Sequence, residues 1–209
     1  FWQPPLYPYL LAFVFSVFGE GQLLPPRLLQ ALLGACVCGL LYLVGRRVFP
    51  HSVALGASVA AALYGPLIYF GGELLPALLG VALNLVMVHR LIQAPRHALG
   101  PYLLVGILLG LSSLAVANVL LFLPFLLLWL WLWRGPVAGT RRSVQAALVV
   151  AGCGLIILPV TARNILVGDD WVLISSNAGI NFYIGNNPDF EQTVNIRPGR
   201  QWAELVEMP

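Results

Sequence analysis

The stretch LLQALLGACVCGLLYLVGRR, residues 28–47, decides the fold of this chain of 209 residues. Its first part, Leu28–Gly45, contains no charged side chain, and Arg46 and Arg47 follow directly. A run of this length approaches the roughly 20 apolar residues that a helix needs to cross a bilayer. The stretch therefore predicts a transmembrane helix that ends at a basic interface.

Five further stretches have the same apolar character, and several are short enough to need tilt or flanking residues to span. The whole chain is 59% hydrophobic and only 9% charged, which is too apolar for an ordinary soluble domain. We predict an all-α polytopic membrane protein with about six spans. The five further stretches are Val53–Phe70, Leu74–Val88, Leu99–Leu114, Val119–Trp133 and Val144–Thr161.

The charges sort the loops into two sets. The positive-inside rule assigns the loops that carry most arginines to the cytoplasm. The alternate loops, which include Glu73, Asn118 and everything from Arg163 onward, then lie on the outer face together with the N-terminal segment. The cytoplasmic set holds seven arginines: Arg46, Arg47, Arg90, Arg96, Arg134, Arg141 and Arg142.

The segment QPPLYPYLLAFVFSVFG, residues 3–19, is too short between Pro5 and Gly19 for an ordinary span. We predict a juxtamembrane helix that lies on the outer surface. The alternative is a short span, which would move Phe1 inside and leave the other assignments unchanged. The predicted regions are an outer juxtamembrane segment over 1–27, a transmembrane core over 28–162 and an extracytoplasmic loop over 163–209, where a following region begins.

Polar side chains on the predicted outer face are candidates for a ligand site. Gln3 and Tyr7 flank the double proline, and Glu73 is the acid in the loop Gly71–Glu73. Arg163 lies where the last span meets the tail, and a guanidinium there can bind a phosphate through two hydrogen bonds. The alternatives are a solvated loop carboxylate for Glu73 and an interfacial anchor for Arg163.

The tail GDDWVLISSNAGINFYIGNNPDF, residues 168–190, is rich in asparagine and glycine. The pattern predicts a short strand at Trp171–Ile174 and turns at 177–179 and 185–188. Loops of this composition often bind polar ligands such as sugars, and the alternative is a structural cap on the membrane domain. The candidate ligand contacts are Asn177, Asn181, Tyr183 and Asn186.

The common catalytic and cofactor motifs do not occur in the sequence. There is no glycine-rich phosphate loop, no zinc-ligand spacing and no Ser-His-Asp pattern. A divalent metal is left open, although no ligand cluster is visible, and no cofactor is assigned. The arginines form no patch of the nucleic-acid-binding kind.

Several strings resemble the bacterial branch of the dolichyl-phosphate-mannose-protein mannosyltransferase family, glycosyltransferase family 39. They occur in the family's order along essentially the whole chain. The resemblance implies a GT-C-type helix bundle in the bacterial plasma membrane, with its active face outside. The strings are FWQPPLYPYLLA at 1–12, RLLQALLG at 27–34, YFGGELLP at 69–76 and PVTARN with VGDDWVLISSNAGINFYIGNNPD at 159–189.

The resemblance also implies a reaction. Family members take a sugar from a polyprenyl-phosphate carrier and pass it to a protein, lipid or glycan, usually with inversion at the anomeric carbon. Their general base is an acid in the first outer loop, which is expected upstream of Phe1, so the chain is expected to be a fragment. Glu73 is kept as a second candidate for a catalytic role. The expected donor ligands here are Gln3, Tyr7, Arg27 and Arg163.

Two positions depart from the family pattern. Gln3 stands where relatives often carry histidine or lysine, and Val116 stands where they often carry arginine or lysine before the fifth span. These losses of charge leave open a second interpretation, a catalytically inactive scaffold or lipid-carrier binding protein with the same fold. A transporter is disfavoured by the lack of charged side chains within the predicted spans.

Overall fold

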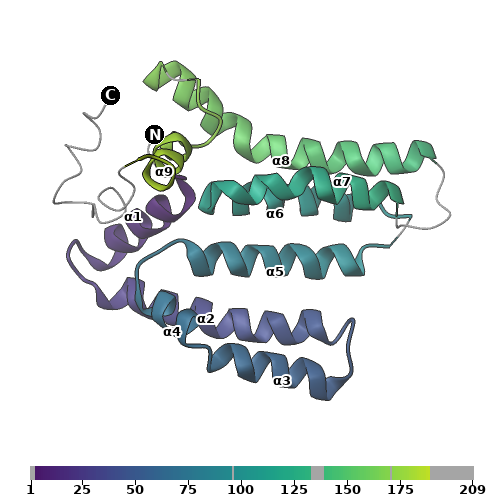
Figure 1. Ribbon diagram of the computed structural model, residues 1–209, viewed down its shortest axis with the longest axis horizontal. Helices are drawn as coiled ribbons and strands as arrows, with labels where there is room; N and C mark the ends of the chain where they lie inside the picture. The colour runs from purple at the N-terminus through teal and green to yellow at the C-terminus, as the bar shows by residue number, and fades with distance from the viewer. Residues whose placement is uncertain (1–2, 96, 133–138, 170, 189–209) are drawn as a thin grey trace.

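The computed structural model describes residues 3–95, 97–132, 139–169 and 171–188, and within these ranges every regular element is a helix. The helices are α1 (Leu6–Phe18), α2 (Leu24–Gly45), α3 (His51–Ala62), α4 (Gly65–Gly72), α5 (Ala77–Gln93), α6 (Gly100–Ala115), the 3-10 turn η1 (Ala117–Leu121), α7 (Phe122–Leu132), α8 (Gly139–Gly168) and α9 (Asn177–Gly185). Figure 1 shows α2, α3, α5, α6, α7 and most of α8 side by side with their axes close to parallel, while α1, α4 and α9 lie at other angles.

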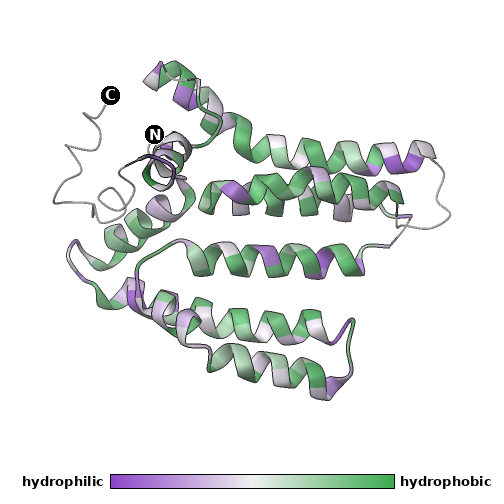
Figure 2. Ribbon diagram, in the orientation of Figure 1, coloured by the Kyte–Doolittle hydropathy of each residue, from purple (hydrophilic) through white to green (hydrophobic). Residues whose placement is uncertain are grey.

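The bundle is held together by contacts between successive pairs of neighbouring helices. Helix α2 packs against α3 and α5, α5 packs against α6, and α6 packs against α8. The ribbon is apolar along nearly all of these helices (Figure 2). Large apolar side chains also cover the outside, such as Leu121 and Phe125, which are 71% and 66% exposed. An apolar exterior of this kind suits a lipid environment, and the prediction of an all-α membrane protein is confirmed.

The helices differ in their capacity to span a membrane. By length and composition, α2 with 22 residues and α8 with 30 can each cross alone. Helices α3 and α4 qualify together as a third, broken span that bends by 51°. The other apolar helices have fewer than 18 residues, so the predicted spans in those places are helical segments of less than full length.

The ends of the bundle separate the loops as the charges predicted. The α2–α3 turn, the α5–α6 connection and the start of α8 lie at one end, which we call the basic end (Figure 1). The described arginines there are Arg46, Arg47, Arg90, Arg141 and Arg142, while Arg96 and Arg134 lie outside the described residues. Helix α1, the Glu73 loop, η1, the end of α8 and α9 lie at the opposite end. Which end faces the cytoplasm stays a prediction.

Helix α1 lies obliquely across the end opposite the basic end rather than along the bundle (Figure 1). It has 13 residues, and Pro5 precedes it while Gly19, at φ 99°, ends it. Its residues Tyr7 and Val14 are buried, and Leu6 packs against the main core. This arrangement matches the juxtamembrane helix that the sequence predicts.

The tightest contact in the bundle is between α6 and α8. A Cβ added to Gly106 would collide with the backbone of Val149, and one added to Gly152 would collide with the carbonyl oxygen of Leu103. A Cβ on Gly110 would come within 2.8 Å of Ile156. Small residues therefore let the two backbones touch, which is how helices gain packing energy in a bilayer that offers no hydrophobic driving force between them.

The tail differs from the prediction. Helix α8 continues to Gly168, so Arg163 lies on a helix. The predicted strand at Trp171–Ile174 is wrong, because the segment has no strand conformation among the described residues and its carbonyls accept hydrogen bonds from α8 side chains. The turn predicted at 177–179 is also wrong, since α9 begins at Asn177. The turn predicted at 185–188 is confirmed, because α9 ends at Gly185.

The α6–α8 contact can be tested with two alanine substitutions on α8. Gly152→Ala should lower the free energy of unfolding by about 1–3 kcal/mol, because its Cβ would press on the α6 backbone. Gly154→Ala is the matched control: its Cβ would sit 3.6 Å from a Leu158 side-chain carbon, and alanine favours the helix. Thermal unfolding in detergent measures both. Equal melting temperatures for the two variants would contradict the close packing.

Candidate functional site

A cavity of about 270 Å³ lies at the end of the bundle opposite the basic end, between the α1 region and α8. We call it the α1–α8 cavity. It brings together two of the predicted donor ligands, Gln3 and Arg163, which are 160 positions apart in the sequence. Its other walls are Pro5, Pro8, Tyr9, Val160, Asn164 and Ile174.

Asn164 on α8 lines this cavity, and the nearby Thr161 helps to hold the segment that follows α8. The buried Asn164 amide donates to the carbonyls of Val172 at 3.0 Å and Ile174 at 3.2 Å. The Thr161 hydroxyl donates to Leu173 at 2.8 Å. Because these bonds hold the segment against α8, Ile174 becomes part of the cavity lining. The sequence analysis did not single out Asn164; its signal was an amide at the end of an apolar span, where a buried polar group needs partners.

Tyr7 was expected in the donor site, but it does not line the α1–α8 cavity; Tyr9 does. Two residues apart on a helix, the side chains point in different directions. Tyr7 is 4% exposed, and its hydroxyl has no hydrogen-bond partner among the described residues. Burial raises the pKa of the Tyr7 phenol to about 12, since the charged form would lose its hydration.

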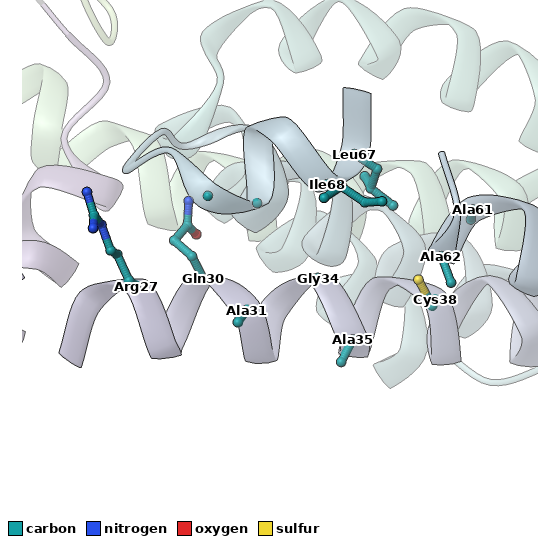
Figure 3. Close-up of a pocket in the computed structure, with 12 residues that line it drawn as sticks. Arg27, Gln30, Ala31, Gly34, Ala35, Cys38, Ala61, Ala62, Leu67 and Ile68 are labelled. Atoms are coloured by element: carbon teal, nitrogen blue, oxygen red, sulfur yellow. The ribbon is translucent and has the colours of Figure 1, made fainter. Parts of the chain in front are cut away.

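Arg27 lies at a different cavity, of about 430 Å³, which we call the α2–α4 groove. Figure 3 shows Arg27 and Gln30 at one end of this groove, projecting from α2 toward the chain that links α4 to α5. Gln30 is 1% exposed, and its Nε2 donates to the carbonyls of Glu73 at 2.7 Å and Leu75 at 3.0 Å. The structure therefore separates Arg27 from Gln3 and Arg163.

The Glu73 carboxylate is exposed, next to Gly72 of the groove lining. Among the described residues, neither cavity is lined by an aspartate or glutamate. The same part of the chain holds no group of three or more His, Cys, Asp or Glu side chains that could bind a metal ion. Neither cavity lining therefore contains a candidate for the general base that the family resemblance implies.

The tail asparagines hold α9 together. The Asn186 amide donates to the Phe182 carbonyl at 2.9 Å, and the Asn187 amide, which the sequence analysis missed, donates to Tyr183 at 2.7 Å. Asn177 accepts from the Ser175 hydroxyl at 3.2 Å. Tyr183 is 41% exposed, and the Asn181 side chain lies outside the described residues. Asn186 thus satisfies a carbonyl in the last turn of α9, where the helix itself offers no donor.

Comparison with known families assigns the chain. The family model described as dolichyl-phosphate-mannose-protein mannosyltransferase matches residues 2–165, which is more than half of the chain. The chain belongs to this family. It is accordingly a membrane glycosyltransferase of the GT-C kind, and the resemblance found in the sequence is confirmed. No curated protein and no solved structure matches the chain.

In this mannosyltransferase-family chain, the position where the sequence resemblance implies a cation holds Val116, an apolar residue. Val116 follows the last residue of α6 and adopts an extended backbone. Its Cγ2 lies 2.9 Å from where a Cβ on Gly80 of α5 would stand, so the valine packs directly on that glycine. The Val116 position therefore serves helix packing in this member of the family.

The buried Tyr7 hydroxyl allows a stability test. Tyr7→Phe should raise the free energy of unfolding by about 1 kcal/mol, because it removes a buried polar group that has no partner. The wild type should also lose stability as pH rises from 10 to about 12, since the unfolded phenol ionises first; the variant should lack this loss. Thermal unfolding at pH 8 to 11 measures both effects.

Tyr9→Phe is the matched control, because Tyr9 lies on the same helix and is 60% exposed. This variant should unfold like the wild type at each pH. If Tyr7→Phe instead unfolds at a lower temperature than both, the Tyr7 hydroxyl makes a stabilising hydrogen bond and the interpretation is wrong.

Proposed function

We propose that this chain transfers a sugar from a polyprenyl-phosphate carrier to a protein, lipid or glycan acceptor at the extracytoplasmic face of the bacterial plasma membrane. The observation that carries the proposal is the α1–α8 cavity, which Gln3 and Arg163 line together. It lies at the end of the bundle opposite the basic end, where the positive-inside rule predicts the outer face.

The side chains of this cavity suit a phosphate that leaves from a sugar. When the bond between the anomeric carbon and the phosphate oxygen breaks, negative charge grows on that oxygen. The Arg163 guanidinium can meet the charge with two parallel N–H donors, and the Gln3 amide can add a neutral donor. Donors fixed in place before the reaction stabilise the developing charge at little reorganisation cost.

The acceptor side needs a base. The acceptor hydroxyl attacks the anomeric carbon from the face opposite the phosphate, and its proton passes to a carboxylate. The family resemblance implies that this base is an acid of the first outer loop. Among the described residues, Glu73 is the exposed carboxylate in the loop that Gln30 holds, and we propose that it orients the acceptor.

Val116 favours a second candidate function. Because this position packs on Gly80 and provides no cation, the chain could bind the carrier without transferring its sugar. Such a protein would bind a polyprenyl phosphate and release no glycosylated product. An assay that follows both binding and product therefore separates the two functions.

Two substitutions in the full-length protein test the transferase. Arg163→Ala should reduce transfer from a labelled polyprenyl-phosphate sugar about 10- to 100-fold, because a charge-assisted contact with the phosphate is lost. Glu73→Gln should reduce turnover while leaving carrier binding intact. Arg90→Gln, at the basic end, is the charge-matched control and should keep full activity. Unchanged turnover in both Arg163→Ala and Glu73→Gln would refute this site.

Gln3 can be tested by restoring the charge that relatives often carry. Gln3→Lys should lower the KM for the polyprenyl-phosphate donor, since a second cation would join Arg163 at the cavity. Gln3→Leu, which removes the amide at similar size, should raise it. Initial rates at varied donor concentration give both values. A KM that is the same in all three proteins would show that the phosphate binds elsewhere.

A further inference from the structure

We propose that the α2–α4 groove binds one phospholipid with an ethanolamine headgroup. Its acyl chain would lie between α2 and the bent pair α3–α4, and its headgroup would meet Arg27, Gln30 and Glu73. The groove itself is separate from the α1–α8 cavity, but Glu73 at its mouth is also the carboxylate proposed to orient the acceptor. The tests below therefore measure lipid binding directly and not sugar transfer.

The groove has the length and lining of a site for an aliphatic chain. Arg27 and Cys38, at its two ends, lie eleven residues apart on α2, which corresponds to about 16 Å along the helix. Its volume of about 430 Å³ falls within the usual range for ligand cavities. Most of its lining between the ends is apolar and small, including Ala31, Gly34, Ala35, Ala61 and Ala62.

The bend between α3 and α4 explains why the groove exists. The two helices meet at 51°, and Pro66 begins the first turn of α4, so that α4 cannot continue the line of α3. Gly71 and Gly72 at the end of α4 contribute no side chains to the part of the groove wall that they form. An apolar groove in a membrane helix pair does not hold water stably, so hydrocarbon from the bilayer is its natural occupant.

Gln30 indicates that the occupant carries a hydrogen-bond donor. Both hydrogen bonds of its Nε2 go to the carbonyls of Glu73 and Leu75, which fixes the orientation of the amide. The Oε1 atom is then left buried and without a partner among the described residues, although Gln30 is 99% covered and lines the groove. A buried acceptor of this kind calls for an N–H or O–H group on the ligand.

The charges at the mouth select the headgroup. Arg27 is a cation suited to a phosphate, and Glu73, directly after Gly72, adds an exposed carboxylate. Phosphatidylethanolamine matches both signs, since its phosphate meets Arg27 and its ammonium has three N–H donors for Glu73 and the Gln30 oxygen. Phosphatidylcholine has no N–H donor, and phosphatidylglycerol has no positive charge for Glu73. The ethanolamine lipid is therefore the occupant that fits all three groups.

Native mass spectrometry of the delipidated full chain tests the proposal. The protein is incubated with phosphatidylethanolamine, phosphatidylcholine or phosphatidylglycerol of identical acyl chains. We expect one bound ethanolamine lipid, with an affinity about tenfold above that of the other two, as for one charge-assisted hydrogen bond. Equal binding of all three lipids would overturn the headgroup assignment.

Two cysteines on α2 provide a matched pair of variants. Cys38→Phe should fill the end of the groove that lies farthest from Arg27, and it should abolish lipid retention. Cys36→Phe makes the same change at an exposed position outside the groove and should leave binding intact. Lipid retention by Cys38→Phe equal to that of Cys36→Phe would refute the acyl-chain site. Gel filtration and circular dichroism of both variants check that the proteins are folded.

Arg27→Gln tests the mouth of the groove with little risk to folding, because Arg27 is exposed. It should weaken all three phospholipids about tenfold, while Glu73→Gln should remove the preference for ethanolamine over choline. Competition with a polyprenyl phosphate completes the test. If that carrier displaces the ethanolamine lipid from the wild type but not from Arg27→Gln, Arg27 holds the carrier phosphate and the proposal is wrong.

Discussion

The contact between α6 and α8 is the constraint on which the rest of the structure depends. Gly106, Gly110 and Gly152 let the two backbones touch, and α6 and α8 pack together more extensively than any other described pair. Gly106 faces Val149 and Gly110 faces Cys153, so the two helices run parallel with a constant register. Beyond this contact α8 contains Pro159, and its last turns bend away from α6 (Figure 1). Arg163 and Asn164 lie on this last part of α8 and line the α1–α8 cavity.

Two buried amides extend this framework to irregular parts of the chain. Gln30 on α2 and Asn164 on α8 are each 1% exposed, and each donates to two carbonyls of a nearby non-helical segment. Carbonyls outside a helix need such partners near a membrane, because lipid offers none. The consequence is the same at both sites. Each amide fixes a segment beside a cavity: one includes Ile174, which lines the α1–α8 cavity, and the other directly follows Gly72 of the α2–α4 groove lining.

The sequence predicted the features that depend on composition along the chain. Uncharged runs indicated the helices, and the alternation of Arg46, Arg47 and Arg90 with Glu73 sorted the loops by end. It failed in the tail, where the turn predicted at 177–179 is the first turn of α9. There the Asn186 and Asn187 side chains make local hydrogen bonds to carbonyls at the end of the helix, which the turn signals did not indicate. Likewise, Arg27 and Arg163 looked equivalent as phosphate ligands. Only the packing of α1 and α4 shows that they face different cavities.

The ends of α6 and α8 also bear on Val116, which stands where the family resemblance implies a cation. Val116 directly follows α6 and packs on Gly80, so charge cannot be placed there without opening the α5–α6 contact. Helix α8 runs parallel to α6 where the two pack, but it contains Pro159 beyond that contact, and its last turns, which carry Arg163, bend away from α6 (Figure 1). Stabilisation of a leaving phosphate depends on the distance and fixed orientation of the donor, and not on its position in the sequence. On the proposed function, the Arg163 guanidinium at the end of α8 is then the cation of this chain that stabilises the leaving phosphate, because the position after α6 holds Val116.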